Sequence, residues 1–351
     1  MTGPKFRVLT PDAQYADDGE IERATAGEGF QFLICRERSA AALPAGVLES
    51  IDALVVWHLL QIDAALIARL RACRVIVRAG VGYDHIDVAA AGAAGIPVCN
   101  TPDYGTSEVA DHAIALMLAL KRGIVSYQDA LRADLQGGFH WSHGLVVDRV
   151  RGTTFGVVGL GRIGTAAALR ARAFGFEILA YDPYLPRGQE IALGFGRVDS
   201  LAELLGASDV VSLHAPLTAE TRNMIDDEAF AAMRPHGILI NTARGGVVDL
   251  DALHRALQDK SIAAAALDVL PEEPPDGAHP LLTAFAEGAD WLRGRLLITP
   301  HAAWYSPASQ SDARRLSVET LVAYLRDGRL QNCVNDHHLV NRRPLPETPS
   351  P

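Results

Sequence analysis

The chain has 351 residues, of which 49% are hydrophobic and 21% charged, and its formal net charge is −10 at pH 7. This length allows two domains of ordinary size, and the composition excludes a disordered or fibrous protein. The acidic balance argues against nucleic acid or an anionic membrane as a partner, and no apolar run reaches the length of a transmembrane helix. The four cysteines lack zinc spacing, so we expect reduced thiols, no bound metal and a cytoplasmic location.

Strands alternate with helical stretches along the whole chain, which is the pattern of parallel α/β sheets. The first third predicts five strands that form a small α/β unit, at 6–9, 32–35, 54–57, 75–77 and 97–99. A largely apolar helix is expected at 107–120, and because most of its faces are apolar it should be buried between domains or at a subunit interface. The glycine-rich segment 132–150 is expected to be a loop, and His140 and His143 within it have no third metal ligand.

The segment Thr153–Asp182 contains a complete nucleotide-binding unit, which reads as strand, glycine turn, helix (165–174) and second strand (177–181). The first glycine of G-x-G-x-x-G permits a tight turn, the second lets backbone approach a pyrophosphate, and the third lets the helix pack closely on its strand. Asp182 ends the second strand, where a carboxylate can accept a hydrogen bond from a ribose 2′-hydroxyl and would repel a 2′-phosphate. We therefore expect NAD, in preference to NADP, to bind Gly159, Gly161, Arg162, Ile163, Gly164 and Asp182.

Four further strands are expected at 210–213, 238–241, 263–269 and 296–299, followed by a helix over 306–326. Ligands of open parallel sheets bind beyond the carboxyl ends of the strands. Arg244 follows one strand end, Asp268 and Glu273 follow the next, and His301 follows the last. Such an Arg, Glu and His set can bind an anionic carbonyl compound and move a proton while NAD moves a hydride.

These motifs resemble the D-2-hydroxyacid dehydrogenase family, and within it most closely the C-terminal-binding-protein branch. The similar segments, spread over residues 75–340, are VVGLGRIG, AYDPYL, NTARGGVVD, ALDV with EEP, TPHAAWYS and NCVN. The resemblance implies an α/β fold of two Rossmann-like, doubly wound parallel-sheet domains with the active site in the cleft between them. Residues 1–103 plus 306–351 would form the substrate-binding domain and 104–305 the NAD-binding domain, and the usual assembly of the family is a homodimer.

The resemblance also implies roles for individual residues. Arg244 would be the catalytic arginine that binds the substrate carboxylate, His301 the general acid/base, and Glu273 the partner of that histidine. Further cofactor contacts would come from Ala215, Pro216, Thr221, Thr242, Ala243, Asp268 and His301, with Asp268 near the nicotinamide carboxamide. Substrate contacts would come from Arg78, Gly80, Val81, Gly82, Arg244 and Trp304. Core packing is an equally good reading of Trp304.

The expected function is interconversion of a 2-keto acid and a D-2-hydroxy acid, and the alternative is an NAD(H)-sensing regulatory protein of corepressor type. The chain ends soon after NCVN, without the long tail of the animal corepressors, which disfavours that alternative. The absence of a following regulatory domain disfavours a phosphoglycerate dehydrogenase. The Glu and His arrangement disfavours a formate dehydrogenase, which needs no proton transfer.

One segment departs from the family pattern. The connection between Glu273 and His301 is longer than usual and includes residues 279–295. The apolar residues of this segment predict an amphipathic helix on the surface or at an interface.

Overall fold

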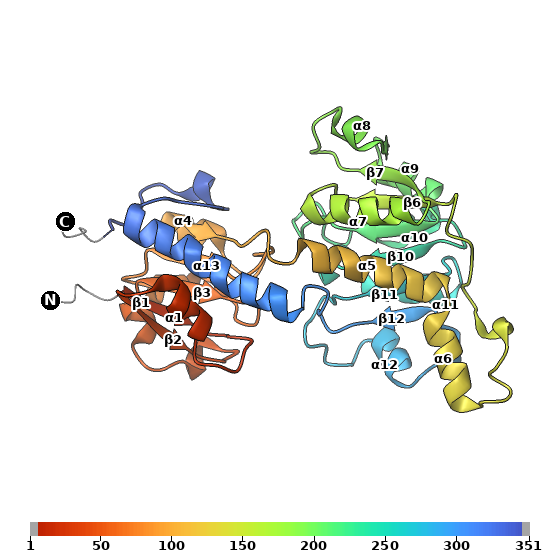
Figure 1. The fold of residues 1–351 in the computed structure, drawn as a ribbon, viewed down its shortest axis with the longest axis horizontal. Helices are drawn as coiled ribbons and strands as arrows, with labels where there is room; N and C mark the ends of the chain where they lie inside the picture. The colour runs from red at the N-terminus through yellow and green to blue at the C-terminus, as the bar shows by residue number, and fades with distance from the viewer. Residues whose placement is uncertain (1–5, 346–351) are drawn as a thin grey trace. The chain divides into compact units, whose positions relative to one another are not determined.

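The computed structural model describes residues 6–345. The chain divides into two compact units, one made of Met1–Gly105 with Tyr305–Pro351 and the other of Thr106–Trp304. The boundaries between the two units lie between residues 105 and 106 and between residues 304 and 305. The sequence predicts them between 103 and 104 and between 305 and 306. The smaller unit is built from early and late segments of the chain because the last long helix, at 307–327, belongs to it (Figure 1).

The smaller unit is built on a five-stranded parallel sheet with the order β2-β1-β3-β4-β5, which is the flavodoxin-like order. Its strands are β1 (Phe6–Thr10), β2 (Phe30–Ile34), β3 (Ala53–Val56), β4 (Val75–Arg78) and β5 (Val98–Cys99). Its helices are α1 (Glu20–Ala26), α2 (Val47–Ser50), α3 (Ala64–Arg69), α4 (Val88–Ala93) and α13 (Pro307–Asp327), with short 3₁₀ turns η1 (Ala40–Ala42) and η5 (Asp336–His338). The central strands β3 and β4 are buried throughout, because layers of helix cover both faces of a parallel sheet.

The larger unit is built on a seven-stranded parallel sheet with the order β12-β11-β10-β9-β6-β7-β8. Its strands are β6 (Thr154–Val158), β7 (Glu177–Tyr181), β8 (Gly196–Arg197), β9 (Val210–Leu213), β10 (Ile238–Asn241), β11 (Ala264–Leu267) and β12 (Leu296–Ile298). The strand order reverses between β6 and β9, and this switch point is where open α/β sheets bind nucleotides. The two parallel sheets confirm the predicted α/β class with two Rossmann-like domains.

The helices of the larger unit cover both faces of its sheet. They are α5 (Thr106–Lys121), α6 (Ile124–Ala133), α7 (Arg162–Ala173), α8 (Gln189–Leu193), α9 (Leu201–Ala207), α10 (Asp227–Ala232), α11 (Leu250–Gln258) and α12 (Pro280–Ala286), with 3₁₀ turns η2 (Trp141–His143), η3 (Gly245–Val247) and η4 (Asp290–Leu292). The apolar helix α5 lies beside α7 (Figure 1), and its buried face joins the core around Phe155. Within residues 6–345, every helix is too short or too polar to span a bilayer.

Several predicted strands and helices begin or end one or two residues away from the observed bounds, and two local expectations differ more. Helix α7 begins at Arg162 and not at Thr165, because the third glycine of the motif belongs to the first turn of the helix. The segment 279–295 is not one helix: it forms the short α12 and the turn η4, and Leu281 and Leu292 are buried in the core of the larger unit. Leu281 and Leu292 therefore complete this core, whereas Phe285 is exposed.

Candidate active site

The glycine turn after β6 has the shape that a pyrophosphate requires. A Cβ atom on Gly159, whose φ is +88°, would lie 2.9 Å from the backbone nitrogen of Ala215, and one on Gly164 would lie 2.0 Å from the carbonyl oxygen of Gly159. A Cβ on Gly161 would meet no atom within 4 Å. The first and third glycines are therefore required by close packing, whereas the second leaves open space beside the turn. These residues fit a dinucleotide cofactor.

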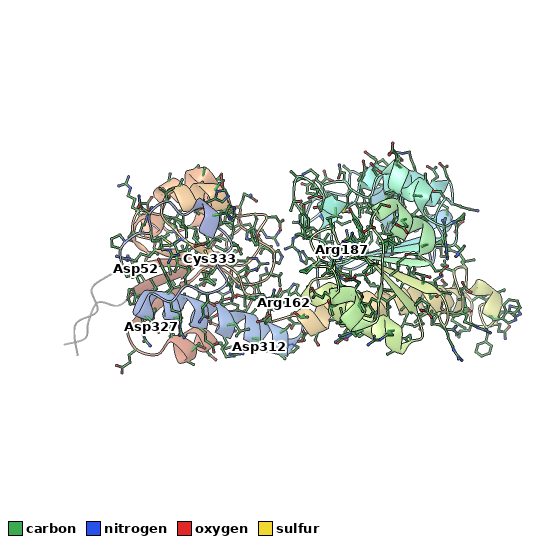
Figure 2. The ribbon with its side chains drawn as sticks, turned by 90° about the horizontal axis from the view of Figure 1, so that it is seen from above. Asp52, Arg162, Arg187, Asp312, Asp327 and Cys333 are labelled. Carbon is green, nitrogen blue, oxygen red and sulfur yellow. The ribbon has the colours of Figure 1, made fainter. Side chains whose placement is uncertain are left out.

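The start of α7 and the end of β7 complete the turn. Arg162, labelled in Figure 2, and Ile163 are the first residues of α7, a 12-residue helix whose N-terminus attracts anions. One oxygen of the Asp182 carboxylate accepts a hydrogen bond from the Leu160 N–H at 2.9 Å, and the other accepts one from the Tyr184 N–H at 3.0 Å. Since an ionised carboxylate has about four acceptor positions, Asp182 can hold the glycine turn and still accept ribose hydroxyl groups.

The end of β9 lies beside this turn, and β10 is the next strand of the sheet. Thr221 donates its hydroxyl to the carbonyl oxygen of Pro216 at 2.5 Å, which fixes the loop that follows Ala215. The hydroxyl of Thr242 is buried and has no hydrogen-bond partner among residues 6–345, and an unpaired buried hydroxyl is costly unless a ligand binds it. His214, which the sequence analysis missed, lies 2.9 Å from the Ser212 hydroxyl, and burial lowers the pKa of its ring to about 4. At neutral pH this histidine is uncharged.

His301 and Glu273 form a direct pair across 28 residues of sequence. Nδ1 of His301 lies 2.6 Å from Oε2 of Glu273, and the other carboxylate oxygen accepts the Leu270 N–H at 2.9 Å. Both side chains are partly exposed. The carboxylate therefore fixes the orientation of the ring.

Asp268 holds the backbone around His301. Its side chain is 1% exposed, and its carboxylate accepts hydrogen bonds from Ala302 N–H and Ala303 N–H, both at 2.9 Å. Its carbonyl oxygen accepts the N–H of His301 at 2.7 Å. His301 has a φ of 52°, which residues other than glycine adopt at a cost of about 1–3 kcal/mol and mostly where neighbouring structure imposes it. The role of Asp268 toward the nicotinamide stays a prediction.

The turn that carries Arg244 is fixed by Asn241, a second residue that the sequence analysis missed. The buried amide of Asn241 donates to the carbonyl oxygen of Arg244 at 2.9 Å and accepts the Ala243 N–H at 3.0 Å. A Cβ atom on Gly245 would lie 1.9 Å from the carbonyl carbon of Leu270. The Arg244 turn therefore packs against the backbone that leads to Glu273.

The expected substrate loop lies in the smaller unit, after β4. Arg78 is 4% exposed and donates to the carbonyl oxygen of Gly82 at 2.8 Å and to that of Ala79. A Cβ atom on Gly80, whose φ is +155°, would lie 2.4 Å from the Arg78 guanidinium, so a side chain here would displace Arg78. Arg78 thus braces the loop that contains Val81, and direct substrate contacts from the loop stay a prediction. Trp304, in the larger unit, is buried, which is consistent both with core packing and with a substrate contact.

The family model for "D-isomer specific 2-hydroxyacid dehydrogenase, NAD binding domain" matches residues 114–303, which include the glycine turn and all three expected catalytic residues. The chain belongs to this family. The match confirms the predicted family and the NAD-binding domain.

Similar proteins come from both sequence and structure. D-3-phosphoglycerate dehydrogenase of Methanocaldococcus jannaschii is 39% identical over 295 residues, 82% of this chain and 52% of that protein. The chain spans about half the length of the curated relatives it matches. NADPH-dependent glyoxylate/hydroxypyruvate reductase of Sinorhizobium meliloti, crystallised with NADP and malonate, has a TM-score of 0.81 at 30% identity, with 97% of this chain and 99% of that chain covered. D-lactate dehydrogenase of Aquifex aeolicus, crystallised with NAD and lactic acid, has a TM-score of 0.77 at 29% identity, with 94% and 99% covered.

Proposed function

We propose that this protein is an NAD-dependent D-2-hydroxyacid dehydrogenase that interconverts a 2-keto acid and the corresponding D-2-hydroxy acid. The observation that carries the proposal is the 2.6 Å contact between His301 and Glu273, located after strands of the same sheet whose glycine turn fits a dinucleotide. When bound there, the nicotinamide cofactor supplies hydride chemistry. The protein must then supply substrate binding and proton transfer.

His301 is proposed as the group that transfers the proton. In reduction, its protonated ring gives a proton to the carbonyl oxygen, and in oxidation its neutral ring takes the hydroxyl proton. Because Glu273 lies at Nδ1, the ring presents its other nitrogen, Nε2, to the substrate.

Arg244 is proposed as the residue that binds the substrate carboxylate and carbonyl oxygen. A planar guanidinium forms two parallel hydrogen bonds with such oxygens, which converts a bimolecular encounter into an oriented complex. Backbone groups of Gly80, Val81 and Gly82 are proposed as further anion contacts, with Arg78 as their brace. Trp304 is proposed to contact the substrate side chain.

The similar proteins narrow the candidate substrates to small anionic compounds. Their names include phosphoglycerate dehydrogenase, glyoxylate/hydroxypyruvate reductase and D-lactate dehydrogenase, so a phosphorylated substrate belongs among the candidates. A corepressor-type role is not favoured, since these relatives are named as enzymes, and the C-terminal-binding-protein branch remains a proposal resting on the motifs. The free cysteines favour a reducing compartment such as the cytoplasm.

A substrate screen tests the proposed function. Oxidation of NADH is measured with glyoxylate, pyruvate, hydroxypyruvate, its 3-phosphate and bulkier 2-keto acids. We expect turnover of at least one, and His301→Asn should lower kcat by about two to four orders of magnitude while NADH still binds, because general acid catalysis contributes that much. Absence of turnover with every keto acid, or a His301→Asn variant as fast as wild type, would contradict the proposal.

We also propose that two copies of the chain form a homodimer through the larger unit. The segment after α6 exposes apolar side chains to solvent, among them Phe139 (82%) and Trp141 (78%). The same unit has a groove of about 1410 Å³, lined by residues of α5, α6, α12 and β12 and by one side of the exposed segment itself. Because each copy carries both the exposed segment and the groove, a two-fold pair can bury both at once.

A further inference from the structure

A chain of hydrogen bonds runs from helix α5 to Asp268. Nε2 of His112 lies 3.0 Å from the Thr299 hydroxyl oxygen, and that hydroxyl donates to the Asp268 carboxylate at 2.6 Å. Since Thr299 gives its single proton to Asp268, it must accept the bond from His112, which places a proton on Nε2 of His112. The direction of the chain is therefore fixed, from imidazole to hydroxyl to carboxylate.

This chain ends on the group that holds the backbone of the proposed acid/base residue. Asp268 accepts the N–H groups of Ala302 and Ala303 with its side chain and that of His301 with its carbonyl oxygen. His301 is in the left-handed region, where its backbone needs support from its neighbours. A change in the orientation of the Asp268 carboxylate would therefore move the turn, and the His301 ring with it.

We propose that His112 and Thr299 are positioning residues for this reaction, acting on His301 through Asp268. The inference rests on the proposed function. Neither His112 nor Thr299 is among the cofactor-binding, substrate-binding or catalytic residues named above. Both lie 31 residues or more from Asp268 in the sequence. An apolar residue at position 112 would suit the packing of α5 but would leave Thr299 without its donor.

Substitutions of Thr299 give the first test. Thr299→Val keeps the shape of the side chain and removes the hydroxyl, so we expect kcat for keto-acid reduction to fall by about tenfold to a hundredfold, as small misplacements of catalytic groups do. The Kd for NADH, measured by fluorescence, should change less than twofold. Thr299→Ser restores the hydroxyl and should restore kcat to within threefold of wild type. The control is Thr283→Val, whose hydroxyl bonds only to backbone near α12 in the bonds identified.

The same logic applies to His112. His112→Gln places an amide donor near the Thr299 hydroxyl and should retain most activity, whereas His112→Phe should lower kcat about as much as Thr299→Val. Both variants should keep KM for the keto acid within threefold, because neither side chain is proposed to touch the substrate.

A double-mutant cycle separates positioning from a general structural role. If Thr299 acts through His301, Thr299→Val should change kcat less than twofold when it is added to His301→Asn. An equal fold-loss in both backgrounds, or a Thr299→Val enzyme as fast as wild type, would overturn the inference. Failure of the proposed function has a different signature, since His301→Asn alone would then leave turnover unchanged.

Discussion

The backbone of Arg244 is fixed by Asn241, and its guanidinium donates a hydrogen bond to the carbonyl oxygen of Ala243 at 2.8 Å. We predict that Arg244→Lys lowers kcat/KM for keto acids by about a hundredfold, equivalent to about 2.7 kcal/mol, because an ammonium group cannot form the planar two-point contact. The Kd for NADH should stay within threefold of wild type. Steady-state kinetics and NADH titration measure both quantities.

The matched control for this change is Arg255→Lys. Arg255 makes a two-point contact with Asp227 on the surface of the same unit, and neither residue belongs to the proposed site. Arg255→Lys should leave kcat/KM for keto acids and the Kd for NADH near their wild-type values. Unchanged keto-acid kinetics in Arg244→Lys would move the carboxylate site elsewhere.

Asp182 gives a prediction about the cofactor, since its carboxylate would repel the 2′-phosphate of NADPH. We predict a higher kcat/KM with NADH than with NADPH. Asp182→Asn removes the charge but keeps an acceptor for the Leu160 N–H, so the NADH to NADPH ratio should fall about tenfold. Initial rates with NADH and with NADPH measure this preference. A wild-type enzyme that prefers NADPH would contradict the proposed role of Asp182 in cofactor selection.

The residues proposed for direct chemistry could be identified from the sequence, whereas His112 and Thr299 could not. Arg244, Glu273 and His301 follow strand ends and match family motifs, so pattern and resemblance both indicate them. His112 and Thr299 are 187 residues apart, and their contact depends on α5 lying along the sheet. No local pattern encodes such a contact. Asn241 left a weaker signal, as a polar residue at the end of an apolar strand.

Strand β5 pairs with the C-terminal segment in a way that places two cysteines side by side. Asn100 N–H donates to the carbonyl oxygen of Asn332 at 3.1 Å, and Val334 N–H donates to that of Val98 at 2.8 Å. Cys99 and Cys333 lie opposite each other between these bonds. The hydrogen bond between the two thiols lowers the pKa of Cys333 and raises that of Cys99, where burial acts in the same direction.

We therefore predict that Cys333 (Figure 2) is the thiol that reacts first with iodoacetamide near pH 7, since the thiolate is the nucleophile. Cys73, whose pKa burial raises to about 12, should stay unmodified in the folded protein. Peptide mass spectrometry over a pH series measures the order. Cys99→Ala removes the stabilising thiol and should move the Cys333 reaction to higher pH. Equal labelling of Cys73 and Cys333 at neutral pH would contradict the assignment.

At the scale of elements, regular strands were predictable and irregular segments were not. The strands 177–181, 210–213 and 238–241 have the predicted bounds, because buried parallel strands are short apolar runs ended by turns. The segment 279–295 was predicted as one helix, yet it breaks at Gly288, whose φ is 69°. The apolar spacing showed that one face is buried but not that the backbone turns within the segment.

In the smaller unit, a largely buried ion cluster joins the segment that follows β1 to helix α13. Arg314 of α13 donates to both carboxylate oxygens of Glu22 at 2.8 and 2.7 Å and to both of Asp17 at 2.8 and 2.7 Å. Its guanidinium also lies 3.6 Å from the ring centre of Tyr15. Arg314 and Glu22 are 292 residues apart, and no local pattern predicts their contact. The chain length indicated two domains, whereas the expectation that one domain is discontinuous came from the family resemblance.

The last prediction concerns the assembly of whole chains. If Phe139 and Trp141 anchor a homodimer, replacing both by serine should convert a particle of two chains into a monomer of 37.6 kDa. Each aromatic anchor is worth about 2 kcal/mol or more at an interface, so the dimer Kd should rise by about a thousandfold for the pair. Light scattering after size-exclusion chromatography measures the mass. The control is Ile191→Ser on α8, which removes an equally exposed apolar side chain (76%) outside the proposed interface and should leave the dimer intact. A wild-type chain that is monomeric at micromolar concentration, or a Phe139/Trp141 variant that stays dimeric, would mean that the exposed segment serves another purpose.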